Sequence, residues 1–208
     1  MIRSGWRLSC VAVVLGLAAC ASAPLHYYTL VPPAGEPAGM VSPFAGSGAS
    51  MPFELLPVSV PAQVDQPQLV VREGSQGVAL LDGERWIAPL GDELRGALSA
   101  DLARELHSQD ASGLPDNDKL RLRIKLDVRR FDSQPGSYAL IEGNWSVRVL
   151  HGASESAVAC TSRISESVGP GYDALVQGHQ QAIGQLAGQI AVAARALADG
   201  QAAACPAP

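Results

Sequence analysis

The chain has 208 residues, of which 15 are basic and 20 acidic, so its formal net charge is −5. An acidic chain is a poor candidate for binding nucleic acid, or for binding anionic lipid through charge alone. The length suits one domain that buries a core, and no apolar run beyond the N-terminal segment is long enough to cross a bilayer as a helix.

The N-terminal segment has the pattern of a cleaved leader, in which two arginines precede a short apolar run at residues 10–17. The stretch Leu17-Ala18-Ala19-Cys20 resembles the lipobox of bacterial lipoproteins, whose cysteine thiol receives a diacylglyceryl group. We therefore expect residues 1–19 to be a signal peptide and Cys20 to carry an anchor of several acyl chains, palmitate among them. An ordinary secretory signal that leaves Cys20 as a spare thiol is the alternative.

Residues 20–52 combine a strand candidate with the composition of a linker. Residues 25–31 are rich in aromatic and branched side chains and indicate a short strand, whereas residues 32–52 are rich in proline and glycine. If the strand joins a sheet, the tether is residues 21–25, which span at most roughly 17 Å. If it does not, roughly thirty flexible residues separate the anchor from the domain.

The next stretch mixes strands with a helix. Residues 53–60 indicate a strand that ends at a proline, and residues 69–72 and 78–81 indicate a hairpin. Leucines that recur every four residues then predict a helix over residues 89–107.

The second half of the chain predicts three consecutive strands and a final helix. Apolar and charged residues alternate strictly over 120–129, and strand patterns follow over 138–150 and 155–168. Short turns join these segments, which indicates an antiparallel meander. A helical apolar stripe then runs over 173–199.

These elements predict an α/β fold of the α+β type, with one domain over residues 53–200 and a tail at 201–208. In it, two main helices pack on a mixed, mostly antiparallel sheet. The last helix contains Gly178, Gly184 and Gly188, each costing roughly 1 kcal/mol against alanine. We expect Gly184 and Gly188 to permit a close approach to the sheet or to a neighbouring subunit.

Several motifs in one order resemble the ABC-type transport auxiliary lipoproteins, and in particular the Pqi-type lipoprotein subunit of MCE lipid transport systems. The resemblance covers nearly all of the chain after the leader. The motifs are Tyr27-Tyr28-Thr29-Leu30, Pro57-Val58-Ser59-Val60-Pro61, Asp65-Gln66-Pro67-Gln68-Leu69-Val70-Val71-Arg72, Arg85-Trp86-Ile87-Ala88-Pro89-Leu90, Glu142-Gly143-Asn144-Trp145 and Gly171-Tyr172-Asp173-Ala174-Leu175-Val176.

The resemblance implies a lipoprotein that helps a periplasm-spanning MCE assembly move phospholipid between the inner and outer membranes. Its partners would be an MCE-domain membrane protein and inner-membrane transporter components, and its role would support envelope integrity. The family fold, with helices on a mixed sheet, favours the short tether. Ala21 stands where an aspartate would retain a lipoprotein at the inner membrane, so the expected location is the periplasmic face of the outer membrane.

The sequence contains no motif of a known catalytic class. It has no Gly-x-Ser-x-Gly elbow, His-Glu-x-x-His, phosphate-binding Gly-x-x-x-x-Gly-Lys or Cys-x-x-Cys pair, and its four histidines are scattered. We therefore expect no enzyme, no catalytic residue, no cofactor and no metal site. The alternative function is a structural outer-membrane lipoprotein that scaffolds another envelope complex, and a periplasmic hydrolase is the third class considered.

Five motif residues are candidates for either the core or an interface. Trp86 precedes the expected helix start at Pro89 and Leu90, so its ring can fix the entry of the helix against the sheet. In a second interpretation Trp86 and Trp145 line an apolar groove or a subunit contact, which would fit a homo-oligomer. Tyr172, at the start of the last helix, belongs to the same set.

The cysteines leave one pair for a disulfide. Cys10 lies in the leader and Cys20 is the expected lipid site, so Cys160 and Cys205 remain together in an oxidising compartment. A bond between them requires Gly200 to reverse the chain, so that the tail folds back along the last strand. Two free thiols are the alternative.

Overall fold

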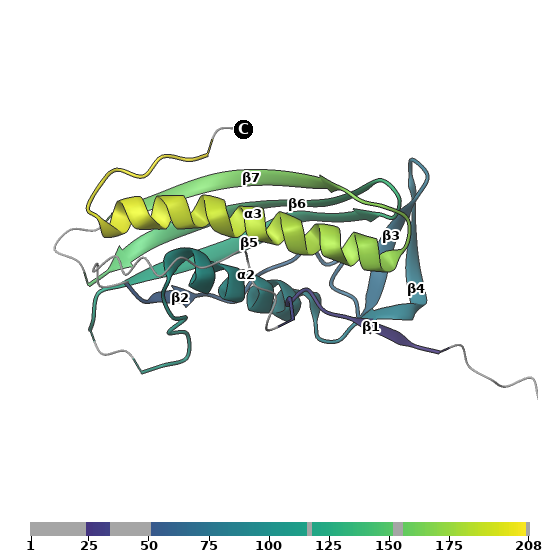
Figure 1. Cartoon of the computed structure of the whole chain (residues 1–208), viewed down its shortest axis with the longest axis horizontal. Coiled ribbons are helices and arrows are strands. Elements are labelled where there is room, and N and C mark those ends of the chain that lie inside the picture. Colours follow the sequence, from purple (N-terminus) through teal and green to yellow (C-terminus); the bar gives the residue numbers. More distant parts are fainter. Residues whose placement is uncertain (1–23, 34–50, 116–117, 152–155, 207–208) are drawn as a thin grey trace, which may run out of the picture.

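The computed structural model describes residues 24–33, 51–115, 118–151 and 156–206, which form two helices packed on mixed sheets. This arrangement confirms the predicted α+β class. Figure 1 shows α2 and α3 lying together in front of the long strands. The elements are β1 (His26–Tyr28), β2 (Phe53–Leu55), β3 (Gln68–Glu73), β4 (Gly77–Trp86), α2 (Leu90–Leu106), β5 (Arg121–Gln134), β6 (Tyr138–Leu150), β7 (Ala157–Ser167) and α3 (Tyr172–Ala198).

The larger sheet has the order β2-β5-β6-β7, and its last three strands form the predicted antiparallel meander. Leu122, Ile124 and Leu126 of β5 are buried, as their alternation with charged residues indicates. The strand expected over residues 53–60 is shorter, because β2 ends at Leu55; beyond it the Leu56 N–H donates to the Ile124 carbonyl at 2.9 Å, and Ser59 forms an isolated bridge with β5. Pro57 lies between them and has no backbone N–H with which to continue the ladder.

The smaller sheet has the order β1-β4-β3, so the described strands form two sheets where the sequence predicts one. The β3–β4 pair is the predicted hairpin, and β1 adds to β4 as a parallel strand with Tyr27 opposite Arg85. The tyrosine-rich segment is therefore part of the fold. Just beyond it, Leu30 is fully buried, and the buried Glu93 carboxylate of α2 accepts hydrogen bonds at 2.8 Å from the Leu30 N–H and the Thr29 hydroxyl.

The two helices begin and end close to the predicted positions. Pro89 stands at the N-cap of α2, whose first turn holds two acidic residues that suit the positive end of the helix dipole. α2 ends at Leu106 and is capped by His107, which takes a left-handed conformation with φ 49°. α3 begins after Gly171 and packs on β6 and β7, while α2 packs along α3. Neither helix, nor any other in the described ranges, is long and apolar enough to span a membrane.

The close approach of α3 to the sheet occurs at Gly178 rather than at the two glycines expected. A Cβ atom added at Gly178 would stand 2.2 Å from Cγ1 of Val168 and 3.1 Å from Cβ of Ala139. At Gly184 the nearest atom, on Asp101 of α2, is 3.6 Å away, and at Gly188 nothing lies within 4 Å. The expectation that Gly188 permits tight packing on the sheet is therefore wrong, because a side chain at this position would enter open space, although Ala187 and Ile190 beside it are fully buried.

This difference predicts opposite effects for the same substitution at two positions of α3. Gly178→Ala should lower the free energy of unfolding by about 1–2 kcal/mol, because Val168 and Ala139 must shift to admit a methyl group. Gly188→Ala should raise it by up to about 1 kcal/mol, because alanine favours the helix and meets no neighbour. Urea unfolding of the two variants beside the parent checks both signs, and equal shifts would contradict the assignment.

Candidate functional site

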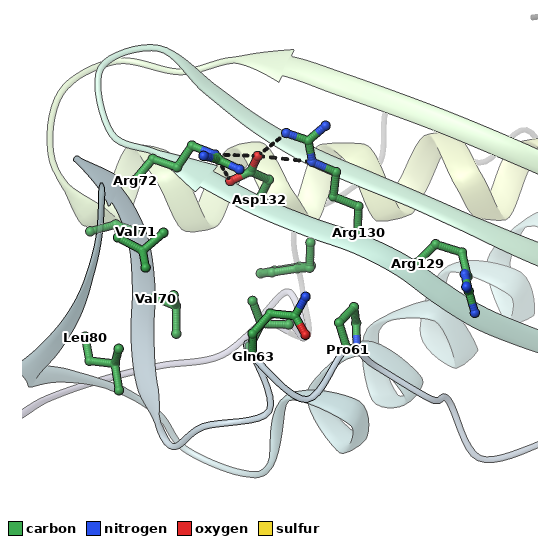
Figure 2. Close-up of a pocket in the computed structure, with 12 residues that line it drawn as sticks. Pro61, Gln63, Val70, Val71, Arg72, Leu80, Arg129, Arg130 and Asp132 are labelled. Atoms are coloured by element: carbon green, nitrogen blue, oxygen red, sulfur yellow. Dashed lines mark hydrogen bonds and ion pairs between the residues drawn. The ribbon is translucent and has the colours of Figure 1, made fainter. Parts of the chain in front are cut away.

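A pocket of about 340 Å³ opens between the β3–β4 hairpin and the second half of β5 (Figure 2). It exists because β3 and β5 belong to different sheets, and because a bulge between Val128 and Arg130 re-aims the side chains of β5. The residues before β3 supply the third side. The lining consists of Pro61, Gln63, Val64, Val70, Val71, Arg72, Val78, Leu80, Arg129, Arg130, Phe131 and Asp132.

One wall of the pocket is apolar and open to solvent. The hairpin register pairs Val70 with Leu80 and Arg72 with Val78, and paired residues of an antiparallel ladder project to the same face. Val78 is 58% exposed and Leu80 is 51% exposed, both high for aliphatic side chains in a strand. This wall therefore presents aliphatic surface that the described chain leaves uncovered.

The opposite wall is an ion cluster around Asp132. The Arg72 Nε donates to both carboxylate oxygens at 2.7 Å, and the Arg130 Nη2 donates to Oδ2 at 2.6 Å. The Tyr138 hydroxyl donates to the same Oδ2 at 3.2 Å. Burial raises the pKa of Asp132, but the hydrogen bonds from Arg72 and Arg130 outweigh it, and the pKa lies below its ordinary value.

The chemistry of this pocket suits contact rather than catalysis. Its one lining carboxylate is ionised and occupied by two guanidinium groups, so it is a poor general base. Three arginines line the pocket, but Arg129 is paired with Asp127 at 3.4 Å, so with Asp132 only one net positive charge remains beside the apolar wall. No group of histidine, cysteine, aspartate or glutamate side chains in the described segments could hold a metal ion. The arrangement fits an amphipathic segment with apolar and anionic groups.

A buried histidine lies directly behind the pocket. His179 of α3 is 1% exposed, its ring stacks on Phe131 at a centroid distance of 3.9 Å, and its Nε2 lies 2.8 Å from the Ser133 hydroxyl. Its Nδ1 is buried without a hydrogen-bond partner. Burial lowers the pKa of His179 to about 3, against a weaker opposing effect of the Asp132 charge, so the ring is neutral at pH 7.

The tryptophans lie in the core, whereas their motif neighbours are distributed between the core and the surface. Trp86 is 5% exposed and meets Phe131 edge to face at 6.2 Å, so it supports the pocket from behind. Trp145 is 2% exposed, and its ring N–H donates to the Ser162 hydroxyl at 2.8 Å. Leu90 is buried and Tyr172 is partly buried, while Pro89, at the α2 N-cap, is exposed.

The structure joins Cys160 of β7 to Cys205 of the C-terminal tail by a disulfide, with Cα atoms 5.5 Å apart. Gly200 has φ 71°, and the Gln201 N–H donates to the Ala196 carbonyl, so the chain reverses directly after α3. Figure 1 shows the tail running back beside β7. Cys20, the expected lipid site, lies outside the described residues.

Residues 28–191 match the model of a family described as the ABC-type transport auxiliary lipoprotein component. The fold resembles the crystal structure of an uncharacterized protein with a TM-score of 0.63, at 18% identity, over 84% of this chain and 99% of that one. A crystal structure of a protein from Xanthomonas campestris matches with a TM-score of 0.49, at 19% identity, over 68% of this chain and 81% of that one. No curated protein matches.

Proposed function

The chain belongs to the ABC-type transport auxiliary lipoprotein family, and from this premise we propose that it is a non-catalytic accessory subunit of an MCE-type lipid transport system. In this role it helps to move phospholipid between the inner and outer membranes and so supports envelope integrity. The observation that carries the proposal is the family match over residues 28–191, which includes the strands from β2 to β7, all of α2 and most of α3. A likeness of fold alone would not distinguish transport from other roles.

We place the protein on the periplasmic face of the outer membrane, anchored through acyl chains on Cys20. The lipobox and the residue after Cys20 support this placement. The pairing of β1 with β4 supports a short tether, because the folded part of the chain begins within a few residues of the anchor. A domain held this way stays at the membrane surface, where a system that delivers lipid has to end.

The pocket beside β3 is the proposed contact for the MCE-domain partner. The Asp132 carboxylate in this pocket is engaged in ion pairs, which supports a binding role rather than a catalytic one. The exposed Val78 and Leu80 side chains offer apolar surface that a partner could bury. A partner segment with an apolar side chain flanked by a carboxylate would satisfy both walls.

Site-specific photo-crosslinking in intact cells tests this function. A photoreactive residue at Leu80, which is 51% exposed on the pocket wall, should give a crosslink to an MCE-domain membrane protein. The same residue at Val192, 61% exposed on α3, is the matched control and should not give that product. If Leu80 crosslinks only to an unrelated envelope protein, the scaffold function replaces the transport function.

A further inference from the structure

Large apolar side chains gather on one face of the β1–β4 pair. Tyr27 is 57% exposed, Leu25 is 48% exposed, and Ile87, directly after β4, is 67% exposed. The Ile87 N–H donates to the Tyr28 carbonyl at 2.9 Å, so the parallel ladder continues to this residue. Side chains two residues apart on a strand share a face, which places Leu25 beside Tyr27 and puts Ile87 on the side of Arg85, the register partner of Tyr27.

This surface, called here the β1 face and consisting of Leu25, Tyr27 and Ile87, lies next to the point where the chain leaves for the membrane. Only residues 21–24 separate Leu25 from the proposed lipid site at Cys20, a reach of at most roughly 17 Å. β1 cannot move away from the domain independently, because β4 and the Glu93 carboxylate both hold the segment.

We propose that the β1 face inserts into the interfacial layer of the bilayer that carries the anchor, and so forms a second, non-covalent membrane contact. A tyrosine between two aliphatic side chains suits this layer, because its ring is apolar while its hydroxyl remains hydrated. The occupant is the bilayer rather than a second copy, because the short tether keeps this face near lipid in every anchored molecule. The inference rests on the proposed lipid attachment at Cys20.

The contact is apolar rather than electrostatic. On β4 the register partner of Tyr27 is Arg85, whose Nε donates to the Asp82 carbonyl at 3.2 Å, and it is the only guanidinium on this face among the described ladder positions. Glu84 is engaged by the His26 ring and the Tyr28 hydroxyl. A single guanidinium gives little attraction to anionic lipid, so binding should depend little on the headgroup charge.

Bromolipid quenching of the full mature lipoprotein tests the proposal. Tyr27→Trp protein is reconstituted into phosphatidylcholine vesicles with or without brominated acyl chains, and the parent emission from buried Trp86 and Trp145 is subtracted. We expect bromolipid to quench about half of the added emission, because the indole would lie at the acyl boundary. Phosphatidylglycerol vesicles should give the same quenching, and a marked increase there would contradict the apolar contact.

Val192→Trp is the matched control, because Val192 is 61% exposed on the C-terminal part of α3, which Figure 1 shows at the opposite end of the molecule from β1. It should not be quenched, and equal quenching at both positions would overturn the proposal. Ile87→Trp is a second reporter in case Tyr27→Trp fails to fold. If both tryptophan reporters are folded and acylated but are not quenched, the proposal is wrong. If mass spectrometry finds no acyl chains on Cys20, the proposed lipid attachment is wrong instead.

Discussion

Replacing Cys160 and Cys205 together with serine is expected to lower the free energy of unfolding by about 4 kcal/mol. The disulfide closes a loop with a sequence separation of 45 residues that contains all of α3, so its loss frees a large part of the unfolded chain. It also releases the tail, whose Ala203 packs against the core. α3 should then lose protection from hydrogen exchange first, beginning at its C-terminal turns.

Urea unfolding followed by tryptophan fluorescence measures this effect, because Trp86 and Trp145 are both buried and report on the core. Parent protein treated with a thiol reductant is the control and should show the same loss. A double variant as stable as the oxidised parent would show that the bond contributes nothing to the fold. Reductant that destabilises the parent but leaves the double variant unchanged would assign the effect to this bond.

Acid is expected to destabilise the protein through His179, with a loss that begins above the range in which carboxylates titrate. The imidazole is neutral in the fold with a pKa of about 3, whereas in the unfolded chain its pKa is 6.5. The unfolded state therefore binds the additional proton first, and the contribution of His179 is complete above pH 6.5 and is lost as the pH falls toward 3. The loss at pH 5 is about 2 kcal/mol, and near pH 3 it approaches about 5 kcal/mol.

His179→Gln isolates this term, because glutamine can still bond to the Ser133 hydroxyl but takes up no proton. The expected result is a variant less stable than the parent at pH 7, whose stability falls about 2 kcal/mol less between pH 7 and pH 5. Burial raises the pKa of Asp101, so protonation of this residue in acid favours the folded state and opposes the effect of His179. Asp101 is present in both proteins, so its contribution cancels when their pH curves are compared. Parallel pH curves for parent and variant would contradict the assignment.

The parts of the fold that local pattern determines could be predicted from the sequence. The leucine repeat and Pro89 mark α2 to within a residue, and the strand patterns mark β6 and the first part of β5, which continues beyond the alternation to Gln134. The division into two sheets could not be predicted, because it depends on which strand edges meet in space. Glycines in a helix show where another segment can approach closely, but not whether one does. Gly178 meets Val168 and Gly188 meets nothing, although both glycines lower helix stability by the same amount.

The candidate pocket was beyond sequence analysis for the same reason. Arg72 and Asp132 are 60 residues apart, and each is ordinary in its own strand. The alternation stops at Arg129, where the bulge lies, but this break does not reveal that the strand continues and turns Phe131 toward Trp86 and His179. Burial of His179 gives only a weak signal, its place on the apolar stripe of α3, which serves equally for a partly exposed histidine.

The attachment of β1 has a mechanical consequence. β1 runs parallel to β4 with three residue pairs in register, and the chain leaves toward the membrane from the first of them. A pull on the anchor along the strand axis stretches all three pairs together in shear, and the Glu93 bonds behind them share the force. A pull across the axis would break the pairs one at a time. With the proposed anchor at Cys20, the domain would therefore bear tension best when that tension runs along β1.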